Sequence, residues 1–408
     1  MTKTQDSNPA ALVYRLLTER RPMPRVIGIG EPVHGVKAFP RVRNEVFEHL
    51  VEHAGFQTIA LESDAWAGRL VDAWVRRTPG CEGLTEDEVL ANGFSHGFGA
   101  SPANRELLRW ARTRNAGLPT ADQVRVTGFD GPMEMVATPS PRATLLHLYD
   151  YLSGRDLDRA LPCDRDTLTR LLGADEPWVE PMAMLDPSRS VGGEQRVRDV
   201  RLLADDLTRT LEAEAPALRR AGDPGLEDAE LAARTATGLL AHHAAMARPS
   251  DDRAGLLCAL RDTMMADNVA ALARRTPVLL FAHHQHLRTG TSTMAWGGVR
   301  IAGVDVPPTT LRWQPAGAHL ATRLGDRYAV VAMAVGRAEE HGIGEPDPST
   351  AESALAARPP DRRLVAGQEL RDLRTGRAAR ATSHPGYFTR DDDLLDELDA
   401  VLFLRDAD

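Results

Sequence analysis

The chain has 408 residues, of which 42% are hydrophobic and 26% are charged. These shares are ordinary for a globular protein and exclude a chain that is disordered throughout. The formal net charge of −9 argues against a nucleic-acid partner held by neutralised phosphates. A chain of this length is long enough for one large α/β domain, or for a core domain that carries an insertion.

The cysteines and the termini bear on the compartment. Cys81, Cys163 and Cys258 lie far apart and in no CxxC or metal-ligand spacing. Such a scattered, odd set is typical of a reducing compartment, where thiols act as small apolar side chains. The N-terminal segment MTKTQDSNPA lacks the apolar region of a signal peptide, and no run reaches the roughly 18 apolar residues of a membrane span. We therefore expect a soluble, cytoplasmic protein with no membrane partner.

Four short apolar segments in chain order predict buried strands, because continuous apolar runs between turn residues are typical of parallel strands covered on both faces. They are RVIGIG at 25–30, QTIAL at 57–61, VRVTGF at 124–129 and PVLLFA at 277–282. Residues 39–54 and 104–114 repeat apolar side chains at helical intervals. This alternation predicts an α/β fold, with a central sheet of parallel strands flanked by helices.

A different pattern separates the third predicted strand from the fourth. Residues 142–273 are rich in Leu, Ala and Arg, which favour helices, and show no clear strand. We interpret them as a helical insertion subdomain between two parts of the α/β core, residues 1–141 and 274–408.

The C-terminal part has weaker patterns. Residues 328–335 (YAVVAMAV) predict a further strand, and residues 299–304 (VRIAGV) predict a less distinct one. Residues 340–363 contain several Pro, Gly and Ser residues and are interpreted as a loop.

Ionisable side chains follow each of the four predicted strands. The strands lead, in order, into Glu31 and His34, into Glu62, into Asp130, and into His283 and His286. In an open α/β sheet, ligands bind in the crevice beyond the carboxyl ends of the strands. We therefore predict a catalytic site built from Glu31, His34, Glu62, His283 and His286.

Other polar residues receive simpler interpretations. Asp130 is interpreted as a turn or helix-cap residue, and His284 is expected to point away from its two neighbours. His49 and His53 are spaced like a metal pair on a helix but are interpreted as exposed side chains. The adjacent His242 and His243 lie in the helical insertion and are assigned no function.

One string, GFSHG at 93–97, matches the GxSxG pattern of a nucleophile elbow. A true elbow follows a buried strand and opens a helix. The preceding residues TEDEVLAN favour a helix instead, so we interpret the match as a glycine-rich loop and do not assign Ser95 as a nucleophile. His96 is a candidate substrate contact.

Several motifs lie in a characteristic order along roughly residues 25–335. They are GEPVHG at 30–35, Arg43, LE at 61–62, ELLRW at 106–110, VTGFD at 126–130, RDTMMADN at 261–268 and AHHQH at 282–286. This ordered set resembles the erythromycin esterase family. Two departures flank the site: the family usually has His-Asn-Gly-His where this chain has residues 283–286, and residues 36–38 differ from its usual pattern.

The resemblance implies an α/β sheet with a helical subdomain and a hydrolytic site that uses no metal or other cofactor. It implies that His34 is the general base and that Glu31 and Glu62 support it. It also implies that His283 and His286 are further essential residues. Substrate contacts are expected from Arg43, His96 and Arg261.

The chemistry of these residue types suits hydrolysis. An imidazole such as His34 titrates near neutral pH and can take a proton from water, while Glu31 or Glu62 orients the ring. His283, His286 and Arg43 are candidates to hold the developing oxyanion. The expected substrate is a small molecule, a lactone or ester of a macrolide or related polyketide.

Three alternatives use the same residues. His and Glu side chains could hold a zinc ion that activates water. The same base could serve a cyclase, dehydratase or other lyase of polyketide biosynthesis. The chain could also sequester a ligand without turning it over, although a pure binding protein has no need of five titratable groups in one site.

Overall fold

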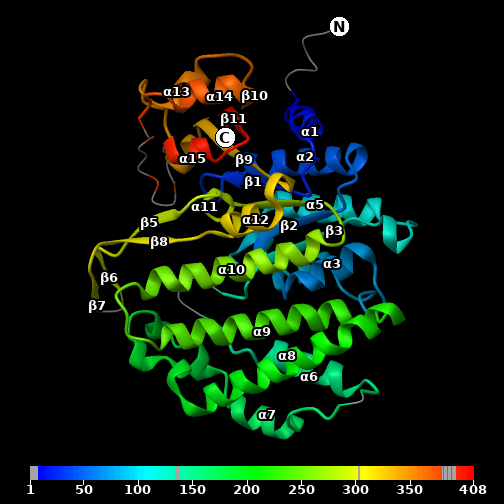
Figure 1. Ribbon diagram of the computed structural model, residues 1–408. Helices are drawn as coiled ribbons and strands as arrows, with labels where there is room; N and C mark the ends of the chain where they lie inside the picture. Colours follow the sequence, from blue (N-terminus) through cyan, green and yellow to red (C-terminus); the bar gives the residue numbers. More distant parts are fainter. Residues whose placement is uncertain are drawn as a thin grey trace.

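The computed structural model describes residues 8–133, 138–157, 159–301, 304–378, 380, 384, 387 and 392–408. Within them, a seven-stranded sheet has the order β10-β11-β9-β1-β4-β2-β3 (Figure 1). Its strands are β1 (Val26–Glu31), β2 (Thr58–Asp64), β3 (Arg125–Asp130), β4 (Val278–His283), β9 (Tyr328–Arg337), β10 (Arg362–Ala366) and β11 (Ala400–Asp406). Only the β10–β11 pair is antiparallel. The predicted fold class, a largely parallel sheet flanked by helices, is confirmed.

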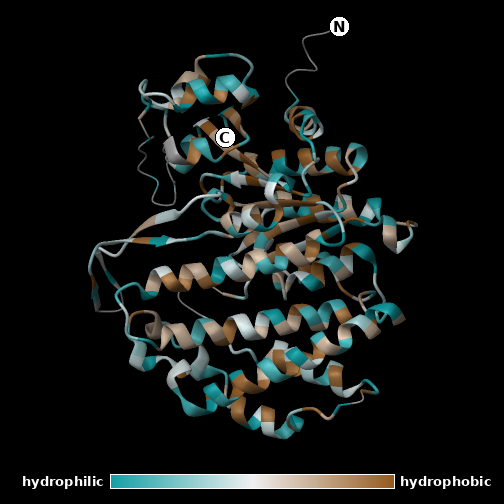
Figure 2. Ribbon diagram, in the orientation of Figure 1, coloured by the Kyte–Doolittle hydropathy of each residue, from teal (hydrophilic) through white to brown (hydrophobic). Residues whose placement is uncertain are grey.

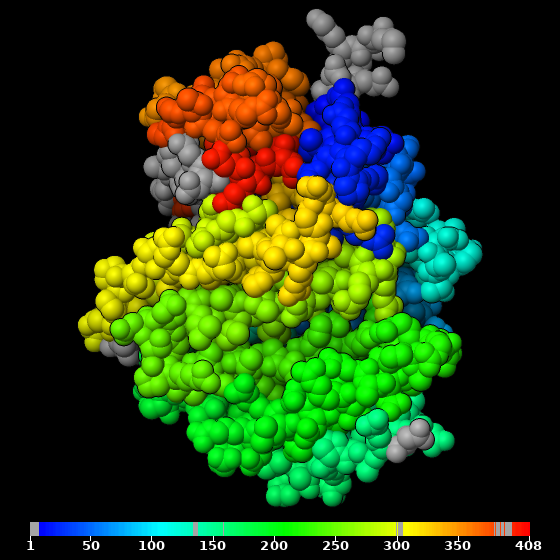
Figure 3. All heavy atoms as spheres, viewed as in Figure 1, coloured from blue at the N-terminus to red at the C-terminus, as the bar shows by residue number. Residues whose placement is uncertain are grey.

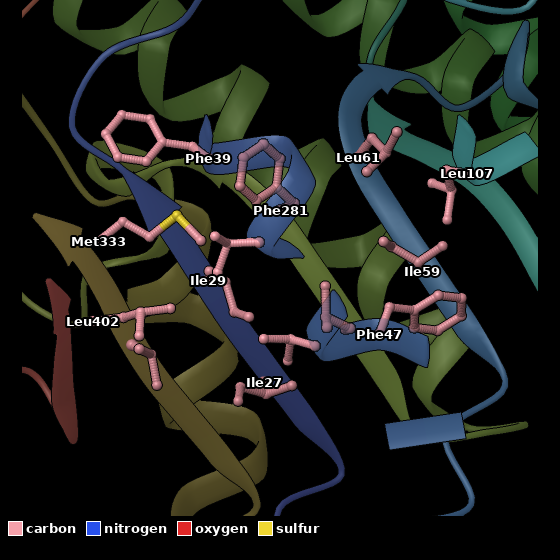
Figure 4. Packing of buried hydrophobic residues seen from close by; sticks show 14 of the residues in the cluster. Ile27, Ile29, Phe39, Phe47, Ile59, Leu61, Leu107, Phe281, Met333 and Leu402 are labelled. Carbon is pink, nitrogen blue, oxygen red and sulfur yellow. The ribbon is translucent and has the colours of Figure 1, made fainter. Parts of the chain in front are cut away.

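Both faces of the sheet are covered, which is why its strands are apolar throughout. Successive side chains of a strand point to opposite faces, so Ile27 and Ile29 enter one core while Val26 enters the other. Figure 4 shows the first core, where Phe39 and Phe47 of α2 lie over β1 and β2. The helices that line this first core are α1 (Pro9–Glu19), α2 (Ala38–His53), α3 (Gly68–Arg76), α4 (Glu86–Asn92) and α5 (Pro102–Arg114).

The second face is covered mainly by α10 (Arg253–Ala273) together with four shorter helices near the C-terminus. Those are α12 (Ala316–Leu324), α13 (Ala351–Ala356), α14 (Gly367–Arg374) and α15 (Asp392–Asp396). Because α10 also packs against α9, it is enclosed between the sheet and a further layer of helices (Figure 1). A helix enclosed on two sides can hold polar side chains away from water.

The layer beyond α10 has a core of its own. It consists of α6 (Arg142–Ser153), α7 (Arg165–Leu172), α8 (Gln195–Ala221) and α9 (Leu226–Met246), with buried residues such as Leu148 and Leu207, and Trp178 from the segment between α7 and α8 packs among them. Figure 2 shows hydrophobic and hydrophilic residues interspersed along these helices, as expected where one face of each helix is buried. In the described residues, no strand occurs between β3 and β4.

None of the described helices combines the length and the apolar character that crossing a lipid bilayer requires.

Two C-terminal predictions were wrong. The segment 299–304 is not one strand: β6 (Val299–Ile301) and β7 (Val304–Val306) pair antiparallel, and residues 302 and 303 lie outside the described residues. Next to them, β5 (Ser292–Trp296) pairs with β8 (Thr309–Trp313), and the four strands form an arm at the left of Figures 1 and 3. The expected loop at 340–363 contains α13, which begins where the Thr350 side chain caps its first turn.

The order of the strands opens a crevice at one position. The chain leaves β1 for β2 on one side and leaves β4 for β9 on the other, so neighbouring strands β1 and β4 connect in opposite directions. Ligand sites form at such switch points. Gly30 allows the short helix α11 (His284–Leu287) to cross here, because a Cβ on Gly30 would lie 2.6 Å from the Cβ of His284.

Candidate active site

The carboxyl ends of β1, β2, β3 and β4 place four ionisable residues at one edge of the sheet. They are Glu31, Glu62, Asp130 and His283, each the last residue of its strand or close to it. All four are buried. The contacts described below join them to His34, His286 and Arg261, so the structure brings together most of the residues that the sequence predicts.

His34 and Glu31 form a pair. The Nδ1 atom of His34 lies 2.7 Å from Oε1 of Glu31, so in the neutral ring Nδ1 donates and Nε2 carries the free electron pair. The His34 side chain is 41% exposed and the Glu31 side chain only 5%. A water molecule or substrate can therefore reach this imidazole, while the carboxylate that orients it is shielded.

Burial and charge act on this pair in different ways. Burial raises the pKa of Glu31 above its ordinary 4.5, although His34 opposes this. Burial alone would lower the pKa of His34, but the carboxylates of Glu62 and Glu31 outweigh it and raise that pKa above 6.5. The environment therefore favours the imidazolium that proton uptake by His34 would create.

Glu62 is the central anion of the site. Its carboxylate accepts hydrogen bonds from the backbone N–H of His283 at 2.7 Å and from Nη2 of Arg261 at 3.3 Å. It also lies 3.2 Å from Nε2 of His286 and 3.7 Å from Nε2 of His34. Burial opposes its charge, yet these positive neighbours hold the pKa of Glu62 well below 4.5. Glu62 is thus ionised, and Glu31 rather than Glu62 orients His34.

His286 lies between two carboxylates. Its Nδ1 atom is 2.9 Å from Oδ1 of Asp262, and its Nε2 atom faces Glu62. Burial would lower the pKa of His286, but Asp262 and Glu62 together raise it to about 10. The ring is therefore an imidazolium in which both nitrogens donate.

Asp262 is the site residue that the sequence analysis missed. It is fully buried on α10 and also accepts from Nε1 of Trp313 at 2.8 Å and from the backbone N–H of Ala316 at 2.7 Å. The available signal was its position beside Arg261 in the RDTMMADN motif. Its role depends on the enclosure of α10, which no local pattern reveals.

His283 differs from His286 although both follow β4. Its Nε2 atom donates to the backbone oxygen of Pro32 at 3.0 Å, and its Nδ1 accepts from the N–H of Gln285 at 3.2 Å. Burial lowers the pKa of His283 to about 3, so the ring is neutral. Both ring nitrogens thus hold backbone groups, which does not favour the expected oxyanion contact; the ring instead holds the loop that carries His34. His284 packs against Gly30.

Asp130 is more than the turn residue that we expected. Besides the N–H of Gly131 at 2.7 Å, it accepts a bifurcated hydrogen bond from Nε of Arg261, which lies 3.0 Å from each carboxylate oxygen. His96 also reaches it, with Nε2 3.2 Å from Oδ2. Burial disfavours its charge, but Arg261 and His96 lower the pKa of Asp130. The ion pair arises because α10 lies across the end of β3, a tertiary contact.

Arg43, a predicted substrate contact, is only 1% exposed. Its guanidinium lies over the ring of Phe281 and donates to Oδ1 of Asn44 and, at 2.9 Å, to Oδ1 of Asn104. Burial lowers the pKa of Arg43 to about 9, against the charge of Glu31. The burial of Arg43 does not favour the predicted substrate contact: α2 turns this side chain toward the sheet, where it contacts Phe281 of β4 and Asn104 of α5.

The remaining candidates have structural roles. The GxSxG string follows helix α4, as expected, and Ser95 accepts from the backbone N–H of Asp64 at 2.9 Å, which fastens this loop to β2. His242 and His243 contact Thr138 and the backbone oxygen of Pro139. His49 and His53 lie against Tyr14 at the junction of α1 and α2.

The donor set does not fit a zinc ion well. In the described part of the chain, no three His, Cys, Asp or Glu side chains are arranged to surround a metal ion. Both nitrogens of His286 already face carboxylates, and both nitrogens of His283 hold backbone groups.

Comparison with known proteins defines the class. The sequence profile of the erythromycin esterase family matches residues 51–407, and the chain belongs to this family. Glu31, His34 and Arg43 precede the matched range, but β1 pairs with the matched strands β4 and β9.

Individual proteins resemble the chain in sequence or in fold. The chain is 24% identical over 330 residues to erythromycin esterase type I of Escherichia coli, covering 77% of this chain and 71% of that protein. The fold resembles a Bacillus cereus protein (TM-score 0.68, 16% identity, 98% and 93% of the two chains). It also resembles an erythromycin esterase EreC variant in its open conformation (TM-score 0.61, 18% identity, 96% and 93%). These relatives do not favour the lyase alternative.

Proposed function

We propose that this protein is an esterase that hydrolyses a lactone or ester bond of a macrolide or related polyketide. The observation that carries the proposal is the pair of an exposed His34 and a buried Glu31, joined at 2.7 Å. Membership of the erythromycin esterase family supports the reaction class, and the names of the relatives support the class of substrate.

In this mechanism, Nε2 of His34 removes a proton from water while the oxygen attacks the carbonyl carbon. The resulting imidazolium is stabilised by Glu31 and by the nearby Glu62, as a buried carboxylate does for the histidine of a serine-hydrolase triad. When the C–O bond breaks, His34 returns the proton to the leaving alkoxide. The products are a carboxylic acid and an alcohol, and no covalent intermediate is needed.

Arg261 is the donor best suited to the developing oxyanion. Its Nε and Nη2 atoms hold Asp130 and Glu62, and its Nη1 atom makes no hydrogen bond to the described residues. The side chain is 25% exposed. Arg261 stays protonated, because Asp130 and Glu62 outweigh the effect of burial and raise its pKa. A fixed cation beside the base is the arrangement that electrostatic stabilisation requires.

Incubation with a panel of macrolides and simpler lactones, followed by mass spectrometry, tests the proposal. We expect a product that has gained one water, and we expect His34→Ala to abolish it. His53→Ala, on an exposed residue of the neighbouring helix, is the matched control and should retain full turnover. Turnover by His34→Ala would refute the base assignment, and a panel without any hydrated product would refute the substrate class.

A further inference from the structure

Another region of the molecule, outside the candidate active site, is hollowed. A groove of about 1540 Å³ runs along β3, between α3 and the region where α8 meets α9 and α10 ends. Its lining includes none of the five predicted catalytic residues. Seven arginines and five carboxylates line it, so the groove is positive in a protein whose net charge is −9.

Most of these arginines are already paired. Five of the seven form ion pairs with carboxylates of the groove; Arg125, for example, lies 2.7 Å from Asp72 and 2.6 Å from Glu227. Arg234 and Arg274 are the exceptions, because no carboxylate of the described residues lies within ion-pair distance of either. Two unpaired guanidiniums therefore share one groove.

The position of Arg234 is fixed by the protein. Its Nε atom donates to Oδ1 of Asn268 at 3.2 Å, and Asn268 in turn donates to the backbone oxygen of Phe129 at 3.1 Å. Its two Nη atoms make no hydrogen bond to the described residues. Asn268 belongs to the RDTMMADN motif, and this contact explains a polar residue there that the catalytic site does not use. The side chain is thus held in place, and its two Nη atoms have no acceptor among the described residues.

The neighbouring charges do not satisfy Arg234. Burial lowers its pKa, and the positive charge of Arg274 adds to this effect against Glu230, Asp267 and Glu227. Two of those carboxylates form ion pairs with other arginines: Glu230 with Arg219, and Asp267 with Arg323 at 2.7 Å. Like charges that face one groove repel each other, and an anion bound between them would remove that repulsion.

We propose that Arg234 and Arg274 form a binding site for a small organic anion, through its phosphate or carboxylate group. A planar guanidinium presents paired donors that match either group. Trp66, Leu226, Leu231 and Leu272 line the same groove and offer apolar contacts to the body of the ligand. The groove is also far larger than an inorganic ion needs. The site is separate from His34 and does not depend on the proposed hydrolysis.

Ligand-induced stabilisation tests the site on the full chain. Thermal unfolding is followed against increasing inorganic pyrophosphate in one series and citrate in another, at constant ionic strength to suppress general screening. We expect a saturable rise in Tm with at least one probe; pyrophosphate alone indicates a phosphate ligand and citrate alone a carboxylate. Arg234→Gln and Arg274→Gln should each weaken the apparent affinity by about tenfold to a hundredfold.

Arg275→Gln is the matched control, because it removes the same charge from the same groove but from an arginine that pairs with Glu227. It should retain the probe affinity of the unmodified chain. Arg274 is exposed, so Arg274→Gln should fold even if Arg234→Gln does not. Without ligand, the Tm of Arg274→Gln should be unchanged or higher, because the repulsion between Arg234 and Arg274 is removed. The proposal is overturned if neither probe raises Tm, or if Arg275→Gln loses as much affinity as Arg274→Gln.

Discussion

Two pairs of buried histidines, one at the edge of the sheet and one in the helical layer, differ because only the first pair contains an imidazolium. His283 and His286 follow β4, whereas His242 and His243 lie in α9, and all four are between 1% and 9% exposed. Yet the pKa of His286 is raised to about 10, while that of His242 is lowered to about 3. Burial opposes the charge of every one of these rings. Only the neighbouring carboxylates decide which of them is an imidazolium.

The fold explains where those carboxylates are. Parallel strands bring their carboxyl ends to one edge, so Glu62 and Asp130 gather there, and the enclosed helix α10 adds Asp262. Around His242 and His243 the helices contribute apolar faces, and the segment before α6 contributes the hydroxyl of Thr138 and the backbone oxygen of Pro139. Within the first pair, His283 resembles the histidines of the helical layer, because it contacts backbone groups.

Asp262→Asn should have the largest effect, because it removes one of the two carboxylates that keep His286 charged. It leaves the His286 imidazolium with one carboxylate in a buried site, and we expect the free energy of unfolding to fall by about 3–5 kcal/mol. Denaturant unfolding measures this. Asp267→Asn, on the same helix but in an exposed pair with Arg323, should cost at most about 1 kcal/mol. Equal losses in the two variants would show that the buried network contributes nothing special.

Glu31→Gln tests whether a carboxylate also raises the pKa of the exposed His34. We expect kcat/KM for the hydrolysed substrate to fall about a hundredfold, because the imidazolium of His34 loses its buried partner. Glu31 helps to raise the pKa of His34, so the rise of kcat/KM with pH should move to lower pH in the variant. A pH–rate profile measures both effects. An unshifted profile would contradict the role of Glu31.

The pH dependence of stability separates the two kinds of histidine. The pKa of His286 in the folded state, about 10, exceeds its ordinary 6.5, so its contribution is complete below pH 6.5 and is lost as the pH rises toward 10. His283 and His242 have folded-state pKa values of about 3, so their contributions are lost as the pH falls from 6.5 toward 3. Each group changes the unfolding free energy by at most about 1.4 kcal/mol per pH unit. Denaturant midpoints between pH 4 and pH 10 should show both declines, and a flat alkaline limb would contradict the charged His286.

Thr138→Val should have the smallest effect. It removes the hydroxyl 3.2 Å from Nδ1 of His242, and we expect a loss of about 1 kcal/mol of stability. Hydrolysis should stay within about twofold of the unmodified rate, because this contact lies in the helical layer. A large loss of turnover would mean that His242 takes part in the reaction.

The local sequence was informative wherever the structure depends on neighbours along the chain. Apolar runs predicted β1 to β4, and their last residues predicted Glu31, Glu62 and His283 at one edge. The three-residue step from Glu31 to His34 favoured contact between these two side chains, which the structure has at 2.7 Å. The local sequence was less informative for residues 299–304 and 340–363. Composition did not indicate the pair of short strands β6 and β7 or helix α13.

The sequence by itself thus determined the fold class, the edge at which the site forms and most of its ionisable members, because strand ends and motif order are local properties. Tertiary structure alone decided their roles. Contacts between distant segments joined Asp262 to His286 and Arg261 to Asp130, and they buried Arg43 beneath the site. Charge in a buried site depends on such neighbours, which come from different elements of the fold.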